Sequence, residues 1–480
     1  MISFTLSIVF LIVGYMVYGK FMERVFGVDN QRPTPSFQNP DGVDYVPMSW
    51  TKAFLIQFLN IAGLGPIFGA IMGIMYGPAA FLWIVLGTIF GGAVHDYMAG
   101  MMSLRSNGAG QPELVGRELG VTIKQFMRFF SIGLMVLVGA VFISGPAELL
   151  NGMTGNTIGY TVWVVLIFAY YILATLLPID KIIGRVYPFF GIALLIMAVG
   201  ILGALIFYSA PIPELTSGLK GVHPAGNPIF PMMFISIACG AISGFHATQS
   251  PLMARCIRSE KEGRRVFYGA MVAEGIVALI WAAAASSFFG SVEGLQEFVA
   301  KLDPTVNKPA VVVDAITREW LGQLGGVLAL LGVVAAPLST GDTALRSARL
   351  MTSEFIKLDQ HSIKNRLLIA VPLFLLTFLL LLVDFDVIWR YFAWWNQTLA
   401  MFTLWAITVY LARYKRLYVV SLLPAVFMTA VTLTYILLAP EGLALPSPLA
   451  YSLGISVSVL LLVLFFIRKP HFNSTYSKTV

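Results

Sequence analysis

Long apolar segments alternate with short polar connections along almost the whole chain. A window of about 19 residues, the length of a membrane-spanning helix, marks roughly thirteen such segments. They lie near residues 2–19, 50–74, 79–104, 123–144, 160–178, 187–208, 228–252, 266–289, 323–345, 366–383, 391–412, 416–439 and 449–467. The pattern predicts an all-α polytopic membrane protein in which residues 1–480 form a single membrane unit.

Two of the predicted helices, the second and the seventh, are interrupted by glycine, proline and polar residues at residues 60–66 and 240–251. Unpaired backbone groups cost several kcal/mol in lipid, so an unwound segment at membrane depth persists only where it lines a protected cavity. The alternative is that the glycines and prolines serve only close packing and kinks. Because the breaks occur in corresponding helices, we interpret them as a substrate site. Its candidate residues are Asn60, Gly63, Gly65, Ser243, Gly244, Phe245, His246 and Gln249.

The spacing of the two breaks predicts an internal repeat. The broken helices are five spans apart, and an odd offset inverts the second unit across the membrane. We therefore expect a five-plus-five inverted repeat with residues 50–208 and 228–412 as its halves. Residues 1–49 would supply a first helix and a cytoplasmic loop, and residues 413–480 the C-terminal flanking helices.

Composition and charge narrow the class further. Hydrophobic residues make up 58% of the chain and charged residues 11%, which excludes a soluble globular protein. The net charge of +7 does not indicate nucleic-acid binding, because the basic residues form short clusters between apolar segments. These clusters lie at residues 20–32, 105–128, 181–185, 255–265, 346–366, 413–416 and 468–469. All fall on one predicted side, so we expect the N-terminus outside, the C-terminus in the cytoplasm, and membrane lipids as partners.

Four ionisable side chains fall inside otherwise apolar segments, where a charge costs at least about 2.5 kcal/mol. Glu274 lies deep in the predicted helix 266–289, His246 lies in the second break, and His95 and Asp96 are neighbours. Burial disfavours an ionised carboxylate, so Glu274 and Asp96 are candidate proton carriers, and a protonated His246 can bind a carboxylate. Adjacent helical residues point about 100° apart, so His95 and Asp96 are not expected to face one ligand together. For each group, the alternative is a neutral, hydrogen-bonded role in packing.

Other chemistry is largely excluded by the motifs. Cys239 and Cys256 make neither a disulfide framework nor a zinc pattern, and the histidines show no close metal-ligand spacing. We therefore expect no cofactor and no metal. The sequence also lacks a Walker A motif, an HExxH motif and a nucleophile elbow, and it has no repeated pore motif. A transporter is thus favoured over an enzyme, a primary pump or a channel.

An aromatic and amide segment lies near the external start of the predicted helix 391–412. Trp394 and Trp395 precede Asn396 and Gln397. Tryptophans at a membrane interface are usually anchors. The two amides either hold the helix against its neighbours or line an entrance.

Four segments of the sequence resemble the carbon starvation protein A family of bacteria. They are GVDYVP at residues 42–47, AGLGP at 62–66, ACGAISGFH at 238–246 and NQTLA at 396–400. The resemblance runs from the first helix to about residue 415, and the chain resembles the compact branch of the family, without the long tails of larger members. It implies a leucine-transporter-like fold of the amino acid, polyamine and organocation type, and uptake of peptides or pyruvate during nutrient limitation.

The same fold analogy adds a candidate ion site in the ninth helix. Ser339 and Thr340 stand where sodium-coupled relatives place hydroxyl ligands opposite carbonyls of the first broken helix. Asp342 is either a titratable replacement for sodium or the partner of Arg346 in a helical ion pair. The sequence leaves both alternatives open.

These observations predict a secondary active transporter in the bacterial inner membrane that imports small peptides, pyruvate or both. Protons are the expected coupling ion, carried by Asp96 or Glu274. The alternatives are a sodium-coupled carrier of amino acids or other small carboxylates, and a transporter-like nutrient sensor. Peptides and pyruvate both carry a carboxylate, so both remain candidate substrates.

Overall fold

The structure, a computed structural model, describes residues 1–41, 44–176, 180–209, 211–358 and 362–469. In this part of the chain every regular element is helical, and one isolated bridge joins Met48 to Ile257. Residues 42–43 of the family resemblance and the end of the predicted helix 160–178 lie outside the described residues, as do the side chains of Lys181 and Arg185.

The elements follow the predicted order. The N-terminal group is α1 (Ile2–Val13), η1 (Gly14–Tyr18), α2 (Gly19–Phe26) and α3 (Pro35–Gln38). The next group is α4 (Trp50–Ile61), α5 (Gly65–Ile74), α6 (Ala79–Leu86), η2 (Gly87–Gly92), α7 (Ala93–Arg105), α8 (Gln111–Leu119), α9 (Val121–Met153), α10 (Tyr160–Leu176) and α11 (Asp180–Phe207). After η3 (Leu215–Ser217) come η4 (Ile229–Met233), α12 (Phe234–Ser236), α13 (Gly244–Ala254), η5 (Glu260–Glu262), η6 (Arg264–Tyr268), α14 (Gly269–Phe288) and α15 (Val292–Ala300). The chain continues with α16 (Lys308–Ala329), η7 (Leu330–Ala335), α17 (Ala336–Ile356), α18 (Ile363–Leu380), α19 (Phe385–Arg413), α20 (Val419–Leu438) and α21 (Ser447–Arg468).

The first predicted break separates α4 from α5, which meet at an angle of 49°. Ala62 leaves the helical conformation at the end of α4, with φ −85° and ψ 52°. Pro66 fits the first turn of α5, where its missing N–H would have no helical partner. A Cβ on Gly65 would lie 2.3 Å from Cys239 Cβ. The glycine therefore lets the first break approach the second.

The second predicted helix break is present, but its boundaries differ from the expectation. The predicted helix 228–252 is divided into η4, α12 and α13, and the backbone is non-helical from residue 237 to residue 243. Residues 244–251, which were expected to belong to the break, form most of α13 instead. Pro251 removes only one helical donor, and α13 is held by packing against α4, α7 and α19, which outweighs that loss.

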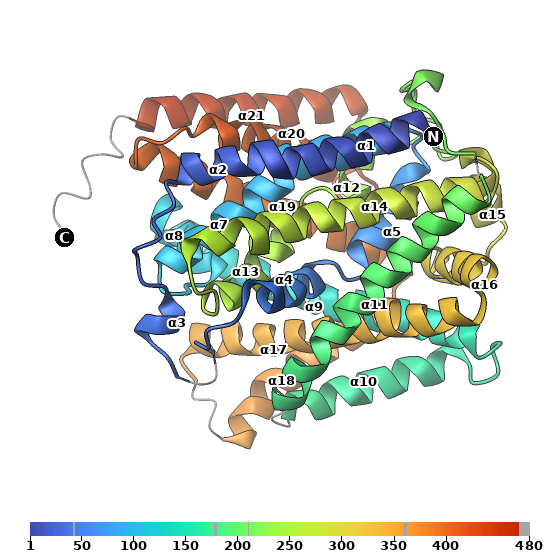
Figure 1. Cartoon of the computed structure of the whole chain (residues 1–480), viewed down its shortest axis with the longest axis horizontal. Helices are drawn as coiled ribbons and strands as arrows, with labels where there is room; N and C mark the ends of the chain where they lie inside the picture. The colour runs from blue at the N-terminus through green and yellow to red at the C-terminus, as the bar shows by residue number, and fades with distance from the viewer. Residues whose placement is uncertain (42–43, 177–179, 210, 359–361, 470–480) are drawn as a thin grey trace.

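Two groups of helices surround the breaks. The broken helices α4–α5 and α12–α13 pack with α7 and α14, whereas α9 packs with α10, α17 and α18. Helix α19 contacts both α13 of the first group and α9 of the second. In Figure 1, α20 and α21 lie along one edge of the molecule, and α10 and α18 lie along the opposite edge. The two breaks thus lie in the interior, between the groups.

Nine helices in the described ranges are long and apolar enough to cross a membrane, or ten if the α4–α5 pair counts as one span. The predicted count of about thirteen is therefore not confirmed. One reason is the second broken helix, whose pieces are each short. Another is α10, of which the described apolar part, Tyr160–Ala174, is shorter than a full span.

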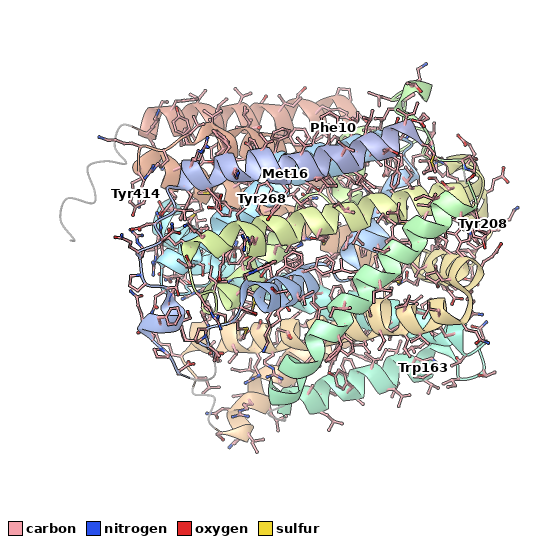
Figure 2. The ribbon with its side chains drawn as sticks, viewed as in Figure 1. Phe10, Met16, Trp163, Tyr208, Tyr268 and Tyr414 are labelled. Carbon is pink, nitrogen blue, oxygen red and sulfur yellow. The ribbon has the colours of Figure 1, made fainter. Side chains whose placement is uncertain are left out.

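The outer surface has the distribution of a membrane protein. Phe10 and Met16 on the first helix are each 59% exposed and point outward (Figure 2). Tyr208 and Tyr414 lie at opposite ends of the long axis, as aromatic residues do at the two membrane interfaces (Figure 2). The exposed apolar side chains between them are suited to contact with lipid.

Loops predicted to be cytoplasmic meet at one end of the molecule. Asn39 Nδ2 donates to Asn107 Oδ1 at 2.7 Å, and Arg255 Nη2 donates to Gly108 O at 3.0 Å. The N-terminus and α15 lie at the other end (Figure 1). This separation agrees with the alternation of basic and non-basic loops along the sequence.

Candidate functional site

Asp96 is the centre of a buried cluster at the start of α13. Its Oδ1 lies 2.7 Å from His95 Nδ1, and its Oδ2 lies 2.8 Å from His246 Nδ1. All three side chains are fully buried. An ionised carboxylate only accepts hydrogen bonds, so both imidazoles donate from Nδ1 when Asp96 carries its charge. The carboxylate therefore joins α7 to the first turn of α13.

Glu274 approaches the same histidine from α14. Its Oε2 lies 3.4 Å from His246 Nε2, within ion-pair range, and neither Glu274 oxygen is hydrogen-bonded within the described ranges. A buried carboxylate is stable when it is neutral or when a cation lies beside it. His246 and Glu274 thus offer two adjacent positions for one proton. The arrangement can take up and release a proton with little movement of heavy atoms.

The structure unites groups that the sequence presented separately. Asp96 and His246 are 150 residues apart in the chain but in direct contact. His95 and Asp96 were not expected to face one ligand together. Instead, the His95 ring turns onto the neighbouring carboxylate, which in turn contacts α13. The pair therefore acts as one unit, with His95 supporting Asp96.

The second break is closed by two consecutive amides of α19. Asn396 Oδ1 accepts hydrogen bonds from Phe245 N at 2.7 Å and from Ser243 Oγ at 3.1 Å. Gln397 Nε2 donates to Phe234 O at 3.0 Å, and Ile237 O and Ala238 O lie within 3.5 Å of it. One amide thus satisfies donors at the start of α13, and the other satisfies carbonyls at the end of α12.

These two amides were noted in the sequence but not placed in the site. The signal was available, because two adjacent amides in an apolar segment need buried partners. The sequence offered no means to identify those partners, since the partners of Asn396 lie more than 150 residues away. The amides therefore join the candidate site only through the tertiary structure.

The predicted substrate residues lie in the two breaks and in the helices that adjoin them. A Cβ on Gly63 would lie 2.9 Å from Phe142 Cζ on α9, and one on Gly244 would lie 2.4 Å from Leu399 Cβ on α19. Asn60 is buried at the end of α4. Gln249 Nε2 donates to Thr248 Oγ1 at 2.9 Å, one and a half turns into α13. The structure therefore brings both breaks together between α9 and α19.

The other predicted ion site lies on α17. Ser339 Oγ and Thr340 Oγ1 both donate to Ala336 O, at 2.7 and 3.2 Å. The helical ion pair between Asp342 and Arg346 is present, at 3.6 Å. Ala336 packs against Leu59 of α4, so this part of α17 lies beside the first broken helix. These three residues lie on a different helix from the Asp96 cluster, which α7, α13 and α14 build.

Within the described ranges, no group of three or more His, Cys, Asp or Glu side chains is arranged to hold a metal ion. In the Asp96 cluster, the carboxylate oxygens are already engaged by imidazole nitrogens. Asp96 is therefore held by two imidazoles, and Glu274 lies within ion-pair range of one of them.

Comparison with known sequences places the chain among membrane transporters. The sequence model of the family described as carbon starvation protein CstA matches residues 1–159 and 153–324. An uncharacterised membrane protein of Haemophilus influenzae is 43% identical over 62% of this chain and 94% of its own length. A peptide transporter CstA of Bacillus subtilis is 30% identical over 68% of this chain and 65% of its own. The pyruvate/proton symporter BtsT of Escherichia coli is 28% identical over 58% of this chain and 48% of its own, so the chain spans about half the length of that relative.

Solved structures with the same architecture share little sequence. The manganese transporter of Eremococcus coleocola has a TM-score of 0.53 at 14% identity and covers 90% of this chain and 99% of its own. The structure of MhsT in complex with L-phenylalanine has a TM-score of 0.52 at 16% identity, covering 85% of this chain and 97% of its own. Both have the leucine-transporter-like fold, so the predicted fold class is confirmed. The matches also confirm a transporter rather than an enzyme.

Proposed function

Because the chain belongs to the carbon starvation protein CstA family, we propose that it is a secondary active transporter that imports small peptides or pyruvate, coupled to protons. The observation that carries this proposal is the buried contact of Asp96, His246 and Glu274 beside the second break. The names of relatives support both substrates, since one is a peptide transporter and another a pyruvate/proton symporter. Uptake during carbon starvation is the physiological setting that the family name suggests.

The proposed mechanism is alternating access around the two breaks. The α4–α5, α7, α13 and α14 group would rock against the α9, α10, α17 and α18 group, as in other transporters with inverted repeats. A substrate carboxylate would bind at the broken helices, where helix starts offer N–H groups. The proton would reside on Glu274 or His246 in one half of the cycle and leave in the other. Because His246 belongs to the first turn of α13, its protonation and the position of that helix are linked.

We also propose the bacterial inner membrane as the location, with the N-terminus outside and the C-terminus in the cytoplasm. The basic clusters along the sequence support this orientation. The division into repeats at residues 50–208 and 228–412, flanked by residues 1–49 and 413–480, belongs to the same proposal. Reaction of cysteines introduced singly at the two ends with an impermeant reagent tests the orientation.

Uptake into proteoliposomes is the direct test of the function. The full chain would be supplied with labelled dialanine or labelled pyruvate under an imposed proton gradient or sodium gradient. Uptake of at least one compound that collapses when the proton gradient is dissipated supports the proposal. Uptake driven only by sodium would favour the Ser339 and Thr340 site as the coupling position. A folded protein that transports neither compound would contradict the proposal and favour a sensor.

Replacement of Glu274 by glutamine should separate proton coupling from substrate movement. Glutamine keeps the size of the side chain but holds no titratable proton, so gradient-driven accumulation should fall roughly 5- to 150-fold, the usual range of coupling between sites. Counterflow exchange of unlabelled for labelled substrate should persist. The matched control is Glu297→Gln, because Glu297 is exposed on α15. Retention of full accumulation by Glu274→Gln would place the coupling site elsewhere.

Replacement of His246 by alanine should impair uptake in a protein that remains folded. The change removes the ring between Asp96 and Glu274 and leaves the two buried carboxylates without a cation between them. We expect a loss of about 10- to 100-fold in the initial rate of uptake. His223→Ala is the control, because His223 stacks on Tyr76 outside the cluster. Normal uptake by His246→Ala, with equal amounts of protein, would remove this histidine from the mechanism.

A further inference from the structure

Three consecutive residues of α19 connect both helix groups to the second break. Trp395 Nε1 donates to Phe130 O on α9 at 2.7 Å. The next residue, Asn396, contacts the start of α13, and Gln397 contacts the end of α12. The segment thus links α9 to both halves of one broken helix. Movement of the helix groups relative to each other must change at least one of these contacts.

Asn396 places an oxygen where the start of α13 needs an acceptor. The first N–H groups of a helix have no partner within it, and they attract anions. Asn396 Oδ1 receives two of the available donors, Phe245 N–H and the Ser243 hydroxyl. A carboxylate oxygen of a substrate would make the same two hydrogen bonds. Asn396 and such a substrate therefore compete for one position.

Gln397 adds an independent sign that a polar ligand belongs at the break. The side chain is fully buried, and its Oε1 has no hydrogen-bond partner among the residues that the structure describes. Its Nε2 lies against carbonyls of α12, so the terminal amide that carries Oε1 lies at the break. A buried acceptor without a donor is unfavourable. A protonated amino group of a substrate would supply the missing donor.

Asn396 also lies next to the Asp96 cluster. Phe245, whose N–H it binds, directly precedes His246. The titratable groups around His246 are His95 and Asp96 on α7, Glu274 on α14 and Cys239 in the unwound segment. A change of acceptor at Phe245 N–H alters the backbone that carries the His246 ring. Substrate binding at the break and protonation of the cluster therefore involve adjacent residues.

Building on the proposed function, we propose that Asn396 and Gln397 occupy the positions where the polar groups of the substrate bind. The two side chains would then determine which chemical class of substrate the protein accepts. The substrate carboxylate displaces Asn396 Oδ1 from Phe245 N–H, and the substrate amino group donates to Gln397 Oε1. The preferred substrates are therefore small peptides or amino acids that carry both groups. Pyruvate has the carboxylate but no N–H donor, so it fills only half of the site.

Two substitutions test the two halves of this inference. Asn396→Asp keeps an acceptor at Phe245 N–H and makes it a stronger competitor, so KM for labelled dialanine should rise at least about tenfold with little change in maximal rate. Gln397→Met removes the acceptor, so the ratio of dialanine uptake to pyruvate uptake should fall at least about tenfold. Gln397→Asn keeps both the acceptor and the donor of the amide and should retain more of the ratio than the methionine variant. Thr408→Val is the control, because Thr408 is buried on the same helix but bonds to Ser421 on α20.

A binding measurement separates this inference from the proposed function. In detergent, dialanine should raise the unfolding temperature of the unmodified chain more than dialaninamide or pyruvate does, and Asn396→Asp should lose that shift. Binding without gradient-driven uptake would contradict the transport function but support the inference. An unchanged KM in Asn396→Asp, an unchanged ratio in Gln397→Met, or equal shifts with dialanine and dialaninamide would overturn it.

Discussion

We expect replacement of Asp96 by alanine to abolish gradient-driven uptake and to make the protein less stable. The substitution leaves His95 and His246 buried without their shared acceptor. Removal of one partner from a buried charged pair usually costs about 3–5 kcal/mol. We expect this loss of stability to appear as a lower midpoint of thermal unfolding in detergent. Uptake should fall to the background level of empty liposomes.

Asp96→Asn distinguishes a functional loss from a loss of folding. Asparagine keeps the shape and one acceptor, so most of the protein should remain monodisperse while accumulation falls at least about 100-fold. Asp303→Ala is the control, because Asp303 is exposed in a turn and bonds only to nearby Thr305 within the described ranges. Normal accumulation by Asp96→Asn would reduce Asp96 to a packing residue.

The second large effect is expected when Gly244 is replaced by alanine. The added Cβ would lie 2.4 Å from Leu399 Cβ and 2.5 Å from Ala400 N and Asn396 O. Two of these three atoms belong to the backbone of α19 and cannot rotate away. We expect a destabilisation of about 3 kcal/mol, at the upper end of overpacking effects. Because α13 must then move away from Asn396, we expect uptake to fall as well as stability.

A glycine in open space provides the comparison. A Cβ on Gly203 of α11 would meet nothing within 4 Å. Gly203→Ala should therefore leave uptake unchanged and slightly raise stability, since alanine favours a helix by up to about 1 kcal/mol over glycine. Thermal unfolding of both variants in the same detergent measures the difference. Equal midpoints of thermal unfolding for Gly244→Ala and the unmodified chain would show that α13 and α19 can separate without loss of stability.

The proposed proton coupling and the packing of the helices depend on the same short segment. The first turn of α13 carries Gly244, which fits closely against α19, and His246, which binds Asp96. Between them, Phe245 donates its N–H to Asn396. Predictions for these residues therefore are not additive, because residues in direct contact usually couple by about 0.5–3 kcal/mol. Double substitutions at positions 244 and 396 should show this coupling most strongly.

The class of the protein and the existence of both breaks could be predicted from the chain itself. Apolar segments of spanning length, and glycine and proline inside two of them, are local properties that no tertiary contact needs to reveal. The same holds for the candidate proton carriers, because a charge inside an apolar segment is costly wherever the segment packs. Asp96, His246 and Glu274 were identified on this basis and lie together in the structure.

Other features depended on contacts between distant parts of the chain. The end of the second break was misplaced because Gly244 and Pro251 favour non-helical structure locally, whereas packing keeps α13 helical. The predicted number of spans was not confirmed, in part because a broken helix has the hydropathy of a continuous one but is divided into short pieces.

The sequence by itself determined that this is a polytopic membrane protein with two interrupted helices and a few buried ionisable groups, since hydropathy and the cost of buried charge act residue by residue. Only the tertiary structure decided which ionisable groups contact one another and which side chains close the break. Asp96 and His246, and Asn396 and Phe245, are about 150 residues apart in the chain. Their hydrogen bonds exist because three helices pack at one depth, and packing of that kind is not encoded in any local pattern.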